Sequence, residues 1–210
     1  MKPILIKFYE QIRRRYLFLL RRFWAPRIPL NKDGKVYVNV GCGLSSSSEF
    51  INVDVLPLPN IHYINEIEDL AMFPDNSVDL IYASHVIEHI PRERLVKTLK
   101  EWRRALKRGG ILRFSVPSFD QLIKIYHGNG DDVSVVQNQV LGQKPPYDNH
   151  YTLWNMKSAE KLLQESGFGE IRVWSPETVD HHDFLDRSSR SIVAGDEDIQ
   201  LSLNLETVKL

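Results

Sequence analysis

Residues 35–54, KVYVNVGCGLSSSSEFINVD, decide the fold of this chain. A short apolar run ends in Gly41-Cys42-Gly43, and a second apolar run ends in Asp54. Glycines directly after a strand let a ligand approach the main chain, and a carboxylate that closes the next strand can accept hydrogen bonds from two ribose hydroxyl groups. The stretch therefore predicts a nucleoside site, with an ordinary glycine turn as the alternative.

The spacing distinguishes two classes of nucleoside cofactor. A dinucleotide site needs the full G-x-G-x-x-G pattern at the start of a helix and an acidic residue about 20 residues further on. Here the third glycine is missing and Asp54 comes earlier. The link is also shorter than the roughly 10 residues of a strand-helix-strand crossover. S-adenosylmethionine carries no phosphate and needs only the turn and the carboxylate, so this cofactor is favoured.

The composition fits one globular domain with a central sheet. The chain has 210 residues, 42% of them hydrophobic and 26% charged. Its single cysteine excludes a disulfide framework and a cysteine-built zinc site. The net charge is zero, but residues 1–30 hold eight basic residues and only Glu10 as an acid, which is +7 and leaves about −7 for the rest. We therefore expect no nucleic-acid partner for the domain.

The first 30 residues predict a basic amphipathic helix, which divides the chain into a helix over 1–30 and a domain over 31–210. The helix docks on its own domain or on a second copy in a homodimer, or else residues 1–27 lie on an anionic membrane surface. An acidic partner or RNA is a third alternative. The longest uncharged apolar run, 16–20, is far below the roughly 20 residues of a spanning helix. We expect a cytoplasmic protein, with the inner membrane face as the alternative. The apolar stripe consists of Ile4, Phe8, Ile12, Tyr16, Leu19 and Phe23.

Strand and helix patterns alternate along the rest of the chain, which predicts a parallel sheet covered on both faces. The helix over 92–108 ends at a Gly109-Gly110 cap, and Ser118 and Ser158 begin two further helices. Residues 128–151 lack periodicity and predict a lid or substrate loop. The predicted strands are 35–40, 50–55, 61–64, 78–84, 111–116, 170–174 and 201–208.

Two histidine-containing segments raise the question of a metal. His85-Val-Ile-Glu-His89 matches the H-x-x-E-H pattern of zinc proteases, but it follows a strand directly and Pro91 argues against a long helix through both histidines. His85 is expected to face the pocket, and His89 is a second pocket residue or a packed histidine. Residues 181–186 offer two histidines and two aspartates as ligands, with a solvated loop as the simpler reading. No metal is assigned.

Several blocks in order resemble the class I S-adenosylmethionine-dependent methyltransferases, and above all the small bacterial members often associated with surface polysaccharide biosynthesis. The resemblance implies S-adenosylmethionine as cofactor and a Rossmann-like, doubly wound, three-layer α/β/α fold. Its seven strands would have the order 3-2-1-4-5-7-6, with the last strand antiparallel. The blocks are VNVGCG, FINVD, FPDNSVDLIYASHVIEHI, LKEWRRALKRGGILRFSVPSFD, SGF and LSLNLETVK.

The same resemblance assigns cofactor-binding roles by matching position. Gly41, Cys42 and Gly43 would pass under the methionine and ribose, Asp54 would bind the ribose hydroxyls, Val55 and the pair Asp69 and Leu70 would meet the adenine, and Ser84 and His85 would lie beneath the cofactor. Family members often carry an acidic residue at the position of Asn39 and a glycine at that of Ser45, so binding could be weaker here.

The implied reaction is methyl transfer to an oxygen or nitrogen, for which His89, His85 and His150 are the candidate general bases. The family association points to a sugar or glycan acceptor. Three alternatives stay open: a lipid-linked or small aromatic acceptor, an NAD or nucleotide-sugar oxidoreductase, and a catalytically silent methyltransferase-like binding module.

Overall fold

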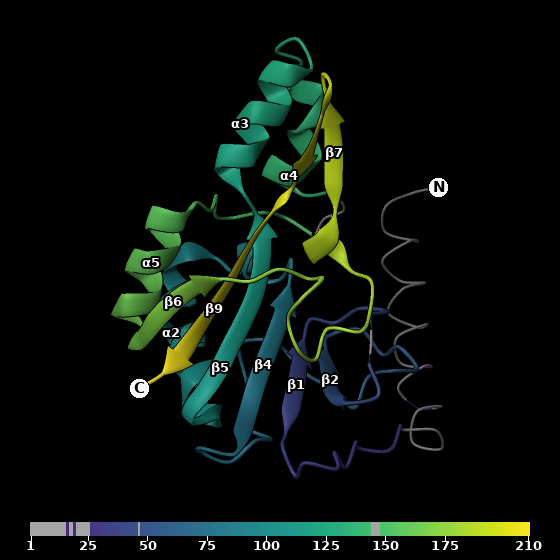
Figure 1. Ribbon diagram of the computed structural model, residues 1–210. Helices are drawn as coiled ribbons and strands as arrows, with labels where there is room; N and C mark the ends of the chain where they lie inside the picture. Colours follow the sequence, from purple (N-terminus) through teal and green to yellow (C-terminus); the bar gives the residue numbers. More distant parts are fainter. Residues whose placement is uncertain (1–15, 17–18, 20–25, 46, 144–147) are drawn as a thin grey trace.

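The computed structural model describes residues 16, 19, 26–45, 47–143 and 148–210. In this part of the chain, the main sheet has seven strands in the order β3-β2-β1-β4-β5-β9-β6, and β7 and β8 form a separate hairpin (Figure 1). The strands are β1 Tyr37–Val40, β2 Phe50–Asp54, β3 Tyr63–Ile64, β4 Val78–Ser84, β5 Leu106–Pro117, β6 Phe168–Val173, β7 Ser191–Ala194, β8 Glu197–Gln200 and β9 Ser202–Lys209.

The strand order and directions confirm the predicted Rossmann-like fold, with β9 in the place of the seventh strand. β1 pairs in parallel with β2 and β4, and β4 pairs in parallel with β5. β9 pairs antiparallel with both β5 and β6. The carboxyl ends of β1, β2 and β4 therefore meet at one edge of the sheet, where ligands bind in open α/β folds.

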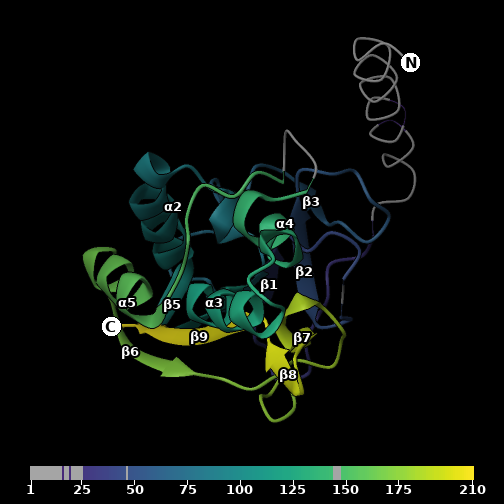
Figure 2. The same cartoon turned by 90° about the horizontal axis from the view of Figure 1, so that it is seen from above.

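Helices α2 and α5 cover one face of the sheet (Figure 2). Leu99 and Trp102 of α2 and Leu163 of α5 are almost fully buried, in one core with Ile81 and Leu112 of the strands. The helical segments in the described residues are α2 Arg92–Ala105, α3 Phe119–Gly128, α4 Gln137–Leu141 and α5 Met156–Glu165, with short 3-10 turns η1 Ile87–His89, η2 Val133–Val135 and η3 Arg187–Ser189.

The segment 174–190, not a helix, covers the other face in the described part of the chain. Trp174 packs with Tyr37 and Tyr82 of the sheet, and Val179 and Phe184 join the same cluster. The connections after β1 and β2 are short, and their described residues form no helix on this face. This long segment lies directly over the strands that lead to the predicted site.

A small cap extends beyond the carboxyl end of β5. Figure 1 shows α3, α4 and β7 together above the sheet, and we call α3, η2, α4, β7 and β8 the cap. Its core includes Leu122, Ile125 and Val136 packed against Ala194 and Ile199. The cap has its own apolar core, which holds its elements together beside the ligand-binding edge of the sheet.

Four local predictions need correction. α2 ends at Ala105 because Leu106 turns extended and buries its side chain, and Gly109 lies with φ +75° in an irregular start of β5 instead of capping the helix. α5 begins at Met156, since Asn155 is its N-cap and Ser158 completes a capping box. The segment 128–151 contains η2 and α4, and β7 and β8 are two strands that the sequence did not predict.

The predicted basic helix over residues 1–30 lies almost wholly outside the described residues. Within the described part of the chain, no helix combines the length and the apolar character needed to cross a bilayer.

Candidate functional site

A tight turn joins β1 to the link before β2. Gly41 and Gly43 have φ angles of +65° and +54°, which residues with a Cβ rarely adopt. The Gly41 N–H donates a 2.7 Å hydrogen bond to the Val53 carbonyl, which ties the turn to β2. A Cβ on Gly41 would lie 2.6 Å from Val86 Cγ2, whereas one on Gly43 would meet no atom within 4 Å. Packing therefore requires glycine at position 41, and Gly43 borders open space.

The carboxylate of Asp54 lies against this turn. Asp54 is 6% exposed. Its Oδ2 accepts a 2.8 Å hydrogen bond from the Gly43 N–H, and its Oδ1 accepts one of 2.8 Å from the Leu56 N–H. Each oxygen keeps a second lone pair. The carboxylate is thus held in one orientation and can still accept two hydrogen bonds from a ligand.

A cavity of about 390 Å³ opens beside Asp54, and we call it the Asp54 cavity. Gly41, Val55, Glu66 and Ile67 also line it. The strand ends, the turn and the loop after β3 therefore enclose one space, as an adenosine site requires.

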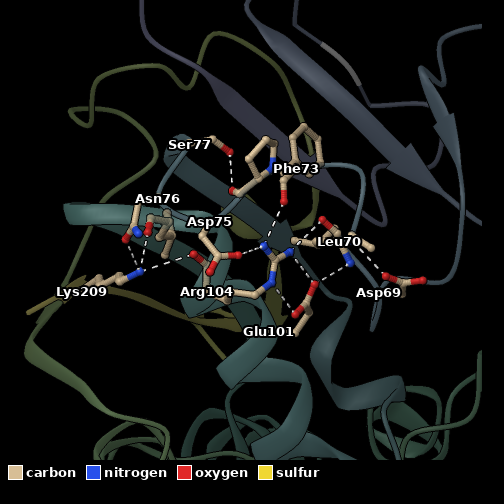
Figure 3. Close-up of polar contacts among 12 residues, drawn as sticks. Asp69, Leu70, Phe73, Asp75, Asn76, Ser77, Glu101, Arg104 and Lys209 are labelled. Atoms are coloured by element: carbon tan, nitrogen blue, oxygen red, sulfur yellow. Dashed lines mark hydrogen bonds and ion pairs between the residues drawn. The ribbon is translucent and has the colours of Figure 1, made fainter.

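Asp69 and Leu70, the pair expected at the adenine edge, are not among the residues that line the Asp54 cavity. Leu70 is fully buried in the core. Its N–H donates to Glu101 and its carbonyl accepts from Arg104, so its main chain is held against α2 (Figure 3). Asp69 Oδ1 accepts from the Ala71 N–H within the loop. Glu66 and Ile67 stand at the cavity in their place.

A second cavity of about 440 Å³, the Asn39 cavity, lies next to the first. Gly41, His85 and His89 line both cavities, so the two meet at these residues. Asn39 Nδ2 is buried and has no hydrogen-bond partner among the described residues. A buried amide donor without a partner is rare in folded proteins, so this wall suits an acceptor atom of a ligand. The lining also includes Tyr82, Ser84, Asp148, Asp186 and Arg187.

Cys42 belongs to the turn but does not act as a nucleophile. The residue is 8% exposed. Burial raises the pKa of its thiol, and the charge of Asp54 raises this pKa further. The thiol therefore stays protonated, and thiolate is the reactive form.

His85 stands at the end of β4 with φ +53°, a strained conformation for a residue with a Cβ. It is 7% exposed, and its Nε2 lies 2.8 Å from Ser202 Oγ. Ser202 Oγ donates its only proton to the Arg187 carbonyl, so His85 Nε2 is the donor to this oxygen. His85 Nδ1 lies 3.3 Å from Glu88 Oε1.

His89 and His150 come together from distant segments. Their ring centroids are 4.8 Å apart. His89 Nδ1 lies 3.2 Å from the Asn149 carbonyl, and His150 Nδ1 lies 2.7 Å from that of Gln139. Burial lowers the pKa of His150, although the nearby Glu88 charge acts in the opposite sense. His89 lines both cavities, and His150 is not among the lining residues of either.

Residues 42–114 match a family profile described as a methyltransferase domain. The match spans about a third of the chain, and it shows a likeness of this stretch to methyltransferase domains. The matched region runs from the glycine turn through Asp54 and both predicted pocket histidines to β5.

Several solved structures of methyltransferases share the fold of this chain. They include an S-adenosylmethionine-dependent methyltransferase from Mesorhizobium loti (17% identity, TM-score 0.53, covering 90% of this chain and 95% of that one). A SAM-dependent methyltransferase from Methanosarcina mazei has 14% identity and a TM-score of 0.52, with coverages of 100% and 98%. The CurJ carbon methyltransferase has 16% identity and a TM-score of 0.50; the match covers 88% of this chain but only 50% of CurJ. No curated protein matches the sequence.

At these identities the structures show a shared fold. Together with the family profile, the fold supports the predicted cofactor, S-adenosylmethionine. The geometry of the two cavities also fits that ligand, because Gly43 opens to space beside Asp54 and Asn39 presents a donor without a partner among the described residues.

Sequence reasoning missed the buried polar cluster that Tyr82, His182 and Asp186 form beside the Asn39 cavity. The Tyr82 hydroxyl donates to Asp186 and lies 3.3 Å from His182 Nε2. The His182 and Asp186 side chains are only 3% and 5% exposed, so the reading of 181–186 as a solvated loop is wrong for them. Burial alone would raise the pKa of Asp186, but hydrogen bonds from His182, Ser188 and Tyr82 lower it. No local pattern marks this cluster, because Tyr82 lies about a hundred positions before His182 and Asp186.

Glu88 was also missed as a site residue, although it stands inside the His85–His89 motif. Its side chain is fully buried beside His85. Burial would raise its pKa, yet the contact with His85 and the charges of His85 and His89 lower it. The sequence signal for Glu88 was its place in the H-x-x-E-H pattern of residues 85–89.

Proposed function

We propose that this domain transfers a methyl group from S-adenosylmethionine to a hydroxyl group of a sugar or glycan intermediate of surface polysaccharide biosynthesis. The contact between the Gly43 N–H and Asp54 at the edge of a 390 Å³ cavity carries the cofactor part of the proposal. The polar lining of the adjacent Asn39 cavity supports the acceptor part, since hydroxyl-rich molecules need hydrogen-bonding partners when they are enclosed.

Residues of both cavities would hold the cofactor. Asp54 would accept hydrogen bonds from the ribose hydroxyls, and Val55 and Ile67 would contact the adenine. Asn39 Nδ2 would donate to the methionine carboxylate. When bound, S-adenosylmethionine supplies a methyl group on a sulfonium, which is already a good leaving group. The domain therefore contributes mainly alignment, for which about 7–11 kcal/mol is available in well-oriented reactions.

A hydroxyl acceptor must lose a proton during the reaction. A general base contributes roughly 10²- to 10⁴-fold. Of the three predicted candidates, His85 and His89 line both cavities, so either can face the acceptor. His150 packs against His89 and is not among the residues that line either cavity.

The proposal also covers the compartment of the reaction and the role of residues 1–27. We place the reaction in the cytoplasm, with residues 1–27 as a basic contact to the inner membrane face or to a second copy of the chain. Flotation of the intact chain and of a chain without residues 1–27 on anionic liposomes separates these alternatives. Loss of flotation on deletion would favour the membrane.

Calorimetric titration with S-adenosylmethionine, its demethylated product and NAD tests the cofactor. We expect the first two to bind and Asp54→Asn to weaken them about 10- to 100-fold, because a hydrogen bond to a charged group contributes roughly 1.5–3 kcal/mol. Asp79→Asn is the matched control, since Asp79 also accepts from the main chain but at the opposite end of β1. Tighter binding of NAD, or unchanged affinity in Asp54→Asn, would refute the proposal.

Methyl transfer from labelled cofactor to sugar acceptors tests the reaction itself. Labelled product on a sugar or nucleotide sugar supports the proposal. Transfer only to lipid-linked or aromatic acceptors would move the function to that class, and cofactor binding without any transfer would indicate a silent module.

A further inference from the structure

Three side chains with metal-ligating atoms converge behind the two cavities. Glu88 and His89 belong to η1, and His150 lies in the segment after α4. Each offers one ligand atom, and these atoms all lie within 4.8 Å of one another. Three ligand atoms at about 2.2 Å from one ion can all be at most about 3.8 Å apart. A contraction of up to about 1 Å, within the range of side-chain movement, would therefore bring all three within reach.

Each of the two histidines places its Nδ1 against a main-chain carbonyl. His89 Nδ1 and His150 Nδ1 face the carbonyl oxygens of Asn149 and Gln139, so these nitrogens carry the protons. In both rings the lone pair is then on Nε2. A metal-binding histidine almost always donates from its other nitrogen to a carbonyl or carboxylate, which fixes the ring in this way.

Two atoms that could bind an ion also have no hydrogen-bond partner among the described residues. His150 Nε2 is buried and has no hydrogen-bond partner among the described residues. Glu88 is 0% exposed; its Oε1 lies 3.3 Å from His85 Nδ1, while no described residue donates a hydrogen bond to Oε2. Burying such groups unpaired is costly. The His85 contact accounts for one carboxylate oxygen and leaves the other, and His150 Nε2, unexplained.

We propose that Glu88, His89 and His150 bind one divalent first-row transition-metal ion. Two imidazoles and one carboxylate suit Mn²⁺, Fe²⁺, Co²⁺ or Zn²⁺ better than Mg²⁺ or Ca²⁺, which prefer oxygen ligands alone. His85 is not a ligand, because Ser202 and Glu88 occupy its two nitrogens. The site therefore differs from the zinc-protease pattern, in which the two histidines of the motif bind the ion.

The position of the ion suggests its use. His89 lines both cavities, and Asp148 Oδ1 lies 3.7 Å from its Nε2. Three protein ligands leave coordination positions open toward the Asn39 cavity. There the ion would act as a Lewis acid on an acceptor with two neighbouring oxygen atoms, which lowers the pKa of a bound hydroxyl. This last step rests on the proposed function, and in it His89 is a ligand and not the general base.

Titration of the chelator-treated full chain with Co²⁺ alone tests the site by visible absorption and calorimetry. We expect one equivalent to bind with a d–d spectrum, and His150→Gln to weaken binding more than about tenfold. His127→Gln is the control, since His127 is 65% exposed and lies in α3 beside Asp131. Glu88→Gln is a second variant, judged only if its circular dichroism matches the parent chain.

The outcomes separate this inference from the proposed function. Co²⁺ binding that His150→Gln weakens and His127→Gln preserves supports the site, even if S-adenosylmethionine fails to bind. S-adenosylmethionine binding by a chain that takes up no Co²⁺, or equal affinity in both histidine variants, would overturn the metal site and leave the cofactor assignment intact. We expect His150→Gln to bind S-adenosylmethionine with unchanged affinity, because it lies outside the Asp54 cavity.

Discussion

The two glycines of the turn after β1 are constrained for different reasons. Gly41 combines φ +65° with a Cβ position 2.6 Å from Val86 Cγ2, while Gly43 has only the unusual φ of +54°. Gly41→Ala should therefore lose more than about 2 kcal/mol of unfolding free energy, since backbone strain and overpacking each cost roughly 1–3 kcal/mol. Gly43→Ala should lose about 1 kcal/mol.

Urea unfolding and calorimetry with S-adenosylmethionine measure the difference. Gly43→Ala should stay folded and bind the cofactor weakly, because its new methyl group enters open space beside Asp54. Equal stability of the two variants would contradict the separate roles.

Residues of the site could be predicted where the signal was local. Gly41 and Asp54 are close in sequence, and the structure brings the turn and the carboxylate into contact. Glu66 could not be distinguished from Asp69, because only the buried packing of Leu70 decides which part of this loop faces the cavity. His150 depends on the fold of a segment with no periodic pattern.

At the scale of elements, α2 fixes the loop that follows β3. Arg104 donates to the carbonyls of Leu70 and Phe73 and to the carboxylates of Glu101 and Asp75 (Figure 3). This loop contains Ile67 of the Asp54 cavity. One guanidinium thus connects a helix on the sheet face to a wall of the site.

Arg104→Lys should lower the unfolding free energy by about 1–3 kcal/mol, because an ammonium cannot reproduce the planar fork that satisfies these partners. The exposed contact with Asp75 contributes little of this. Cofactor affinity should fall as well. Arg108→Lys is the matched control at an exposed position, and urea unfolding with calorimetry compares them. Identical values for the two variants would show that Arg104 does not hold the loop.

Elements with a strong periodic pattern were predictable, and irregular ones were not. β4 has the predicted bounds, 78–84, because its apolar run has clear ends. The end of α2 was placed too late, since Gly109-Gly110 resembles a helix cap but lies in an irregular β5. β7 and β8 escaped prediction because their short strands pack against α3 of the cap, a contact that no local pattern records.

At the scale of the whole molecule, a buried ion pair between β5 and β9 also connects the sheet to the segment 174–190, which covers one sheet face. Arg113 of β5 and Glu206 of β9 are 4% and 3% exposed, with Nε and Oε1 2.5 Å apart. Arg172 of β6 contacts the other Glu206 oxygen, and Arg113 donates to the Asp180 carbonyl. Glu206 therefore links β9 to β5 and β6, and Arg113 links these strands to the segment 174–190.

Glu206→Leu should destabilise the protein by about 3–5 kcal/mol, because it leaves the Arg113 charge buried without its partner. The double variant Arg113→Met with Glu206→Leu should be clearly more stable than Glu206→Leu alone, since no uncompensated buried charge remains. Thermal and urea unfolding of the two variants check this. Additive losses would mean that the charges act independently.

The strand order was predictable only through the resemblance of several sequence blocks to a known family. Alternation of strands and helices predicts a parallel sheet, but it does not place Ser202–Lys209 between two earlier strands. The segment 174–190 has no periodicity, and its role as the cover of one sheet face depends on aromatic contacts such as Phe184 with Tyr82.

The position of β9 has a consequence for biosynthesis. β9 follows β5 and β6 in the chain and leaves the ribosome after them, yet it pairs with both. Until it emerges, a nascent chain holds these two strands with unpaired main-chain edges that can recruit other chains. Translation that stalls before Ser202 thus yields a species prone to aggregate and in need of chaperones, whatever the state of the cofactor pocket already formed upstream.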